Sequence, residues 1–471
     1  MFTSMTRRDL IVGASALVGA GVAASAPRPR KFVEASGLRF ALEGSPYRVA
    51  GTNMWYAAYL GADPPTGNRD RLKRELDRLA SLGINNVRIL GSSEFSPLRN
   101  SVRPTFRDRT SHFNGKLLKG LDHALDEIGK RGMTCVLYLT NFWEWSGGMM
   151  TYLYWTNGGH YIDMNDPAHP WPEFPDMSSE FYGHAAAVRM FDDYVHSVVG
   201  RRNSVTGRLY RDDPAIFSWQ LANEPRPGES PDVVRRHLPP YLDWIDRTAR
   251  LIKSLDPNHM VSSGSEGTQG CANSDTCFID AHSSSAIDYV NAHIWPQNWS
   301  WADPKDLAGT WPTVERNTHD YIVRQTVNAR GLVKPMVIEE FGFPRDGGGF
   351  EPGTPTTFKD RFYRLIYSAV LESAAAGGPI QGCNFWGWGG EGRAQHPDHH
   401  FVRGDTSYVG DPPHEPQGWY SVFDVDSSTR SVIRDYSSAL RSLPSVLPPP
   451  EAPPSAIPPP PPPPAHRSER G

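Results

Sequence analysis

Phe217-Ser218-Trp219-Gln220-Leu221-Ala222-Asn223-Glu224-Pro225-Arg226 reads as a buried strand that runs directly into a polar turn. The apolar first half predicts the strand, and Pro225 ends it because proline has no backbone N–H to donate to a neighbouring strand. Glu224 is therefore expected at the carboxyl end of the strand. In a closed barrel of parallel strands, this is the end that carries the functional side chains.

A second stretch, Pro335-Met336-Val337-Ile338-Glu339-Glu340-Phe341-Gly342, has the same design. A short β-branched strand again ends in carboxylates, an aromatic residue and a glycine, about 115 residues after the first stretch. If both strands belong to one barrel, their glutamates lie at the same rim. Paired carboxyl groups are typical of acid/base chemistry at a glycosidic bond.

Short apolar runs alternate eight times with longer amphipathic stretches, which predicts parallel strands joined by crossover helices in a single (β/α)8 TIM barrel of the α/β class. Long connections follow the second, third, fourth and eighth strands, and at the carboxyl rim they are expected to build an open substrate cleft. The expected strands are 47–53, 86–90, 134–139, 215–221, 260–263, 289–293, 336–339 and 381–386. The expected helices are 68–82, 114–131, 178–199, 240–255, a short one after Cys277, 313–330, 357–376 and 430–443.

The two ends of the chain are expected to lie outside this barrel. Residues 1–26 carry Arg7-Arg8 before an uncharged run of small residues, which is typical of a twin-arginine export signal and predicts a secreted, extracellular protein without a permanent membrane anchor. Residues 446–471 include an unbroken proline run from Pro458 to Pro464, which predicts a disordered or extended tail. Residues 32–443 remain for the barrel.

The composition argues against a nucleic-acid partner, and the positions of the four cysteines predict which of them are bonded. The net charge of −4 gives no basic excess for nucleic acid, and 14 Trp with 18 Tyr offer many faces for sugars. Cys271 and Cys277 stand six positions apart in a polar loop of an exported protein, which favours a disulfide between them. Cys135 and Cys383 fall in non-adjacent strands, the third and the eighth, and are expected to be free and buried.

The motifs resemble a known family. Asn223-Glu224-Pro225 with Glu340-Phe341-Gly342 is similar to the acid/base and nucleophile motifs of the retaining (β/α)8 glycosidases, and flanking residues resemble glycoside hydrolase family 5. Residues 219–226, 141–148 and 293–299 resemble its plant and fungal endo-β-1,4-mannanases, and the resemblance spans 32–443. It implies a monomeric, retaining endo-β-1,4-mannanase that needs neither cofactor nor metal and cleaves mannan, galactomannan or glucomannan.

The resemblance makes Glu224 the general acid/base and Glu340 the nucleophile. Glu339 competes for the second role, but adjacent strand residues point to opposite faces and the family pattern selects Glu340. Arg88 stands alone in an apolar strand, and a buried guanidinium needs a partner. Glu340 is the expected partner, with its pKa lowered by Arg88; Glu94 is the alternative.

The remaining site residues follow from the resemblance. Asn223 is expected to bind the sugar 2-hydroxyl, and Arg226 to reach the leaving-group side. His293 orients the site, while Trp295 replaces a tyrosine of many relatives and could donate to Glu340. Trp386 is expected beneath the reacting sugar, with Trp388 a weaker candidate, and rim tryptophans are expected along the remaining subsites: Trp55, Trp143 and Trp299.

Three features of the sequence bear on alternative functions. His396, His399 and His400 could ligate a metal, but no second ligand cluster accompanies them, which favours a solvated or substrate-lining loop. An endo-β-1,4-glucanase on the same barrel stays open, because residue spacing does not distinguish glucose from mannose at the 2-position. A non-catalytic polysaccharide-binding protein, displayed by the proline-rich tail, is disfavoured because a binder has no need of two glutamates with Arg88 and Asn223.

Overall fold

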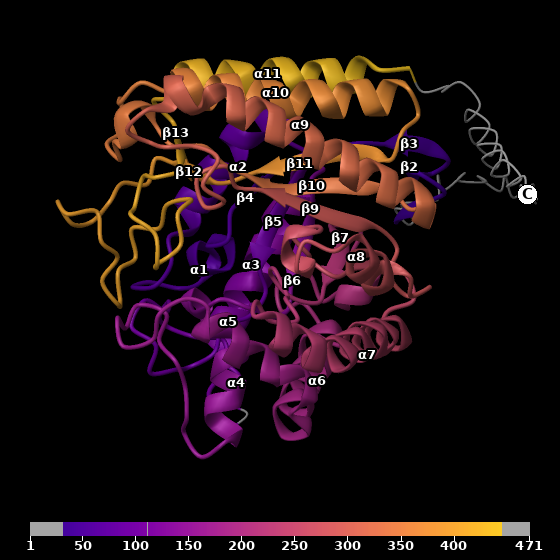
Figure 1. The fold of residues 1–471 in the computed structure, drawn as a ribbon, viewed down its shortest axis with the longest axis vertical. Helices are drawn as coiled ribbons and strands as arrows, with labels where there is room; N and C mark the ends of the chain where they lie inside the picture. Colours follow the sequence, from indigo (N-terminus) through magenta and orange to yellow (C-terminus); the bar gives the residue numbers. More distant parts are fainter. Residues whose placement is uncertain (1–31, 111, 445–471) are drawn as a thin grey trace, which may run out of the picture. The chain divides into compact units, whose positions relative to one another are not determined.

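The computed structural model describes residues 32–444, except residue 111. The export signal predicted at 1–26 and the tail predicted at 446–471 lie outside the described residues. Within the described chain, eight parallel strands form the central sheet, in the order β8-β7-β6-β5-β4-β11-β10-β9 (Figure 1). They are β4 (Val49–Asn53), β5 (Asn86–Leu90), β6 (Thr134–Tyr138), β7 (Ile216–Gln220), β8 (Met260–Ser262), β9 (Val290–Ile294), β10 (Met336–Phe341) and β11 (Ile380–Phe385).

Hydrogen bonds between β8 and Asp288, just before β9, join the two ends of the sheet into a nearly closed barrel. The Asp288 N–H donates to the Val261 carbonyl at 2.8 Å, and the Val261 N–H donates to the Asp288 carboxylate at 2.6 Å. The predicted (β/α)8 barrel is therefore confirmed, and all eight expected strands are present.

Helices cover the barrel, with α9, α10 and α11 along one side and α6 and α7 along another (Figure 1). Side-chain caps fix several helix starts; Asn68 accepts from the Arg71 N–H and Asn114 from the Leu117 N–H. The helices are α1 (Ala57–Gly61), α2 (Arg69–Ser81), α3 (Gly115–Lys130), α4 (Gly148–Thr156), α5 (Glu173–Ser178), α6 (Ala185–Val199), α7 (Pro231–Leu255), α8 (Asp275–His282), α9 (Leu307–Leu332), α10 (Thr357–Ala375) and α11 (Ser427–Ser442).

Helix α7 differs from its prediction, because it begins at Pro231 rather than Pro240 and continues through Pro239 and Pro240. Proline inside a helix removes a backbone donor and normally ends the helix. The first part of α7 is largely solvent-exposed, so water can satisfy the carbonyl groups that lose their partners. Helix α9 likewise begins before an interior proline, at Leu307.

Several elements were not anticipated. An antiparallel sheet of β1 (Val33–Ser36), β2 (Arg39–Leu42) and β3 (Ser45–Tyr47) covers the end of the barrel where the strands begin. The connection after β6 contains α4 and α5, and the short pair β12 (Trp388–Gly390) and β13 (Val422–Phe423) follows β11. These elements are short and interrupt long loops, so they leave no periodic pattern in the sequence.

All four cysteines are free and buried, as expected for Cys135 and Cys383. The disulfide predicted between Cys271 and Cys277 is not formed in this structure. Their thiols contact each other, and this hydrogen bond together with burial raises the pKa of Cys277. Both thiols pack as small apolar groups in the main core. Among the described helices, none has the length and apolar character needed to cross a membrane.

Candidate active site

Glu224 lies just past the end of β7 in an unusual backbone conformation. Its φ angle is +51°, a left-handed value that is strained for a residue with a side chain. The Glu224 N–H donates to the Gly264 carbonyl at 2.9 Å. Gly264 itself has φ of +82°, and a Cβ there would lie 1.8 Å from the Ala222 carbonyl oxygen. The close approach of these two loops holds the carboxyl group of Glu224 over the barrel.

Glu340 lies in β10, where the pairing with β9 is irregular between Ile338 and Glu340. A local irregularity of this kind turns a side chain from the direction that strict alternation would give. As a result, Glu339 and Glu340 both approach Arg88, with Glu339 Oε2 3.8 Å from Arg88 Nε. The two adjacent glutamates therefore do not point to opposite faces, as strict alternation predicts.

Glu339 is nevertheless occupied by protein partners. Its carboxylate accepts hydrogen bonds from Gln220 Nε2 and from the Tyr289 hydroxyl at 2.9 Å, and it is fully buried. It does not line the pocket, whereas Glu340 does. Of the two glutamates, Glu340 is thus the one that faces the pocket.

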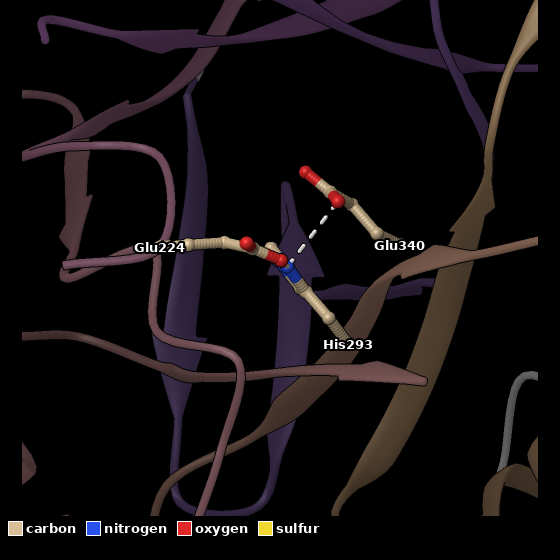
Figure 2. A group of neighbouring side chains, drawn as sticks. All are labelled: Glu224, His293 and Glu340. Atoms are coloured by element: carbon tan, nitrogen blue, oxygen red, sulfur yellow. Dashed lines mark hydrogen bonds and ion pairs between the residues drawn. The ribbon is translucent and has the colours of Figure 1, made fainter. Parts of the chain in front are cut away.

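His293 joins the two carboxyl groups (Figure 2). Its Nδ1 lies 2.6 Å from Glu224 Oε1 and 3.4 Å from Glu340 Oε2. An oxygen of Glu224 and one of Glu340 lie within 4.8 Å of each other. Carboxyl groups about 5 Å apart are typical of retaining glycosidases, since inverting enzymes need roughly 6.5–9.5 Å to admit a water molecule.

Arg88 crosses the barrel from β5 and is completely buried. Its guanidinium donates to Glu340 Oε1, to Asn223 Oδ1 at 2.7 Å and to Gln220 Oε1 at 2.8 Å. Glu94, the alternative partner, instead accepts from the Gly148 N–H at 2.8 Å. Arg88 therefore fixes the nucleophile candidate and Asn223 in one network.

The pKa values of Glu224 and Glu340 are both raised, because both carboxyl groups are buried. Burial raises the pKa of Glu340 well above its ordinary value, with Arg88 opposing and Glu224 adding to the rise. Burial also raises the pKa of Glu224, opposed by Arg226 and by hydrogen bonds from Trp143 and Trp295. Arg88 lowers the pKa of Glu340, as expected, but burial outweighs this ion pair, so the net direction is upward.

Such a pair holds one proton over a wide pH range. Arg88 donates directly to Glu340, whereas Arg226 acts on Glu224 only through space. The charged guanidinium of Arg88 is a stronger donor than the neutral Trp143 and His293 groups that hydrogen-bond Glu224, so the negative charge is favoured on Glu340 and the shared proton is assigned to Glu224. Burial and the nearby guanidinium of Arg88 lower the pKa of His293 well below its ordinary value, so this ring is neutral and donates from Nδ1.

The pair opens into a pocket of about 430 Å³. Seven of the ten site residues predicted from the sequence line it, and Arg88 and His293 lie beneath its floor as partners of the two carboxyl groups. The predicted residues in the lining are Asn223, Glu224, Glu340, Arg226, Trp143, Trp295 and Trp386, and the rim tryptophan Trp299 joins them.

Two predicted tryptophans have other surroundings. Trp55 does not line the pocket; it is 1% exposed and packs edge-on against Tyr56, Tyr59 and Trp145. Trp388 is buried and donates to Glu75 Oε2 at 3.0 Å. Both follow strand ends in the sequence, but the connections after β4 and β11 fold back and cover them.

Trp295 contacts a different glutamate from the one proposed. Its indole hydrogen-bonds Glu224 and lowers the pKa of that carboxyl group, whereas donation to Glu340 was expected. Trp143 also donates to Glu224, with Nε1 2.6 Å from Oε2. The acid/base candidate thus has two indole donors in addition to His293.

Arg226 lies on the Glu224 side of the pocket. It makes a paired contact with Glu266, at 2.6 and 2.9 Å, and its guanidinium lies 5.0 Å from the Trp143 ring. Glu266 was not predicted as a site residue, although it follows the fifth predicted strand as Glu224 follows the fourth. His414 and Glu415 were also missed, because the loop between β12 and β13 has no recognisable motif.

Glu224, His293 and Glu340 are the one group of described residues whose atoms lie close enough to hold a metal ion. Arg88 and Arg226 beside them disfavour a cation, and double displacement requires none. His396 pairs with Asp405 and His399 with Glu351, each in a separate contact.

Buried paired carboxyl groups at the carboxyl rim of a (β/α)8 barrel define the class of retaining glycosidases. The sequence matches the family model described as "GH family 5 beta-mannosidase-like" over residues 30–445. The chain therefore belongs to glycoside hydrolase family 5 and is a glycoside hydrolase.

Individual proteins agree with this family. The crystal structure of a family 5 mannosidase from Rhizomucor miehei is similar at 34% identity and a TM-score of 0.80, covering 88% of this chain and 99% of that one. The mannan endo-1,4-beta-mannosidase 1 of rice is 29% identical over 88% of this chain and 86% of its own length. The protein of that name from Arabidopsis thaliana is 26% identical over 88% and 90%.

Proposed function

We propose that this protein hydrolyses β-1,4-mannosidic bonds with retention of configuration at the anomeric carbon. The observation that carries the proposal is the separation of Glu224 and Glu340 oxygens, within 4.8 Å, with His293 between them. The mannose preference rests on the family and on the relatives named above.

In the first step, Glu340 attacks the anomeric carbon while Glu224 gives its proton to the leaving oxygen. Arg88 holds the attacking carboxylate in place and stabilises its charge before reaction. Asn223, fixed by Arg88 and by Asn141 at 3.2 Å, is positioned to bind the sugar 2-hydroxyl.

In the second step, water enters after the leaving sugar departs. Glu224, now ionised, takes a proton from this water, and the oxygen attacks the anomeric carbon to release Glu340. Trp143, Trp295 and His293 all donate toward Glu224 and stabilise its ionised form. Burial instead stabilises the neutral acid and raises the pKa of Glu224. Because the two effects oppose each other, Glu224 can give up a proton in the first step and take one up in the second.

Cleavage within mannan chains, the endo mode predicted from the sequence, is part of this proposal. Its support is the name shared by the plant relatives, mannan endo-1,4-beta-mannosidase, and the motifs that resemble such enzymes. Export of a monomeric protein to the outside of the cell is proposed with it, supported by Arg7-Arg8 and the uncharged run that follows.

A specific observation favours a second mode, release of mannose from chain ends. The loop after β12 brings Pro412, His414 and Glu415 to the pocket wall beside Trp386. In the strand order, β11 stands opposite β7, which carries Glu224. The leaving sugar departs on the Glu224 side. The wall formed by Pro412, His414 and Glu415 lies on the opposite side, where it limits the room for further sugars of the bound chain. The similar fungal structure is named a mannosidase.

The first experiment measures reducing-end release from β-mannan, galactomannan and a soluble cellulose derivative, with E340A as the blank. We expect activity on the mannans alone, and a loss of roughly 10³-fold or more in E340A and in E224Q. Equal or better activity on the cellulose derivative would overturn the mannan assignment, and a fully active E340A would overturn the mechanism.

The products then separate the two modes. Endo cleavage gives a series of oligosaccharides and an early fall in the viscosity of galactomannan. Release from chain ends gives mannose as the first product, with little change in viscosity.

A further inference from the structure

Trp171 is an exposed aromatic residue in the lining of the catalytic pocket. Its side chain is 56% exposed, whereas Trp295 and Trp386 in the same lining are 7% and 3% exposed. Its ring lies nearly parallel to that of Trp143, with centroids 6.4 Å apart and an interplanar angle of 24°. A large exposed apolar surface beside a buried reactive group marks a binding surface rather than a packing residue.

The segment that carries Trp171 is held in place despite this exposure. The Asp163 carboxylate accepts from the Arg99 N–H and the Asn165 N–H, each at 3.0 Å. Met164 from the same segment packs on a small buried cluster that contains Leu98, Met150 and Phe174. Phe174 in turn lies nearly parallel to Trp143, at 6.2 Å and 13°. The ring is therefore presented by a fixed surface.

The position of Trp171 relative to the acid/base candidate decides which sugar it would meet. Trp143 donates to Glu224 and contacts both Trp171 and Arg226. These residues come from the connections after β6 and β7, which are neighbouring strands. The group that protonates the glycosidic oxygen lies on the side of the leaving sugar, so the exposed ring lies where that sugar emerges.

We propose that Trp171 is the platform of the subsite for the leaving group, where it binds the C–H face of a hexopyranose by stacking. This inference rests on the proposed hydrolysis of β-mannosides. Binding energy from this ring positions the leaving oxygen next to Glu224, so it contributes only to substrates whose leaving group is a sugar.

The test compares mannotriose with β-mannosyl fluoride, whose fluoride leaving group occupies no subsite. In W171A we expect kcat/KM for mannotriose to fall by about tenfold, in keeping with a lost stacking contact. Hydrolysis of the fluoride should stay as in the wild type. W171F keeps an aromatic ring and should recover most of the activity on mannotriose.

The matched control is F95A, because Phe95 is also 56% exposed but does not line the catalytic pocket. F95A should leave both rates unchanged. Equal losses on both substrates in W171A, or no loss on mannotriose, would overturn the platform. A wild-type protein that releases no reducing ends from β-mannan and cleaves neither test substrate would overturn the proposed function and the platform together.

Discussion

Glu224 must release and recover a proton within one reaction, and its immediate partners set how readily it does so. Oε2 accepts from the Trp143 indole at 2.6 Å, and Oε1 lies 2.6 Å from His293 Nδ1. Both contacts stabilise the carboxylate, while burial stabilises the neutral acid. The pH range in which Glu224 acts as an acid therefore depends on single hydrogen bonds.

Replacing Trp143 by Phe tests this balance, because the ring stays and only the donor is removed. A donor to the ionised carboxylate lowers its pKa, so its loss raises the pKa of Glu224. Glu224 must be protonated to give its proton to the oxygen of a sugar leaving group. The alkaline limb of the kcat/KM profile on mannotriose should therefore move to higher pH in W143F.

Trp299→Phe is the control for that measurement, since Trp299 lines the same pocket without a hydrogen bond to Glu224 in the described structure. Its alkaline limb should coincide with that of the wild type. A limb that moves to lower pH in W143F would show that the indole does not stabilise the carboxylate.

The sequence predicted which residues form the site, but not the details of their contacts. Glu224, Glu340 and Arg88 follow from strand ends and from one charge in an apolar run. The approach of Glu339 to Arg88 could not be foreseen, because it depends on an irregularity in the pairing of β10 with β9. Trp55 was misplaced because a tryptophan after a strand has the same pattern whether its loop opens or folds back.

Among the elements, the loop between β12 and β13 forms one part of the pocket wall. Asp411 organises it from a fully buried position, accepting from the Gly418 and Tyr420 N–H groups at 2.7 and 2.6 Å and from the Ser421 hydroxyl. The same loop carries His414 and Glu415 to the pocket wall. Asp411 is thus a positioning residue for that wall.

D411A should release this loop, because two buried N–H groups lose their acceptor. We expect a loss of about 2–3 kcal/mol in the free energy of unfolding and a rise in KM for mannotriose. D398A is the control: Asp398 is exposed in the same loop and, within the described residues, accepts a single hydrogen bond, from the His400 N–H. Unchanged stability and KM in D411A would contradict the role of Asp411.

Strands and long helices were predictable because their side chains repeat with a regular period, as in the run at 86–90 and in α3. The loop at 391–421 has no such period, and its order comes from contacts such as Asp411 with Tyr420. For the same reason His414 and Glu415 could not be recognised as pocket residues before the structure.

On the scale of the whole molecule, the two ends of the barrel have separate roles. The carboxyl rim holds strained backbone and buried charge, as at Glu224 and Arg88, which costs stability. The opposite end is apolar, and Phe40 from the amino-terminal sheet packs there against Phe217 and Tyr289. Stability and chemistry are thus concentrated at different ends.

Phe40→Ala tests this separation, since Phe40 is fully buried and belongs to the apolar end. Removing the ring leaves a cavity, and we expect the free energy of unfolding to fall by about 3–4 kcal/mol. The kcat/KM of the folded protein on mannotriose should stay unchanged, because the described residues of its cluster, such as Phe217 and Tyr289, do not line the pocket. Thermal melting and kinetics on the same sample check both expectations, and Phe40→Leu should lose less stability. A large fall in kcat/KM without a lower melting temperature would show that the covered end takes part in catalysis.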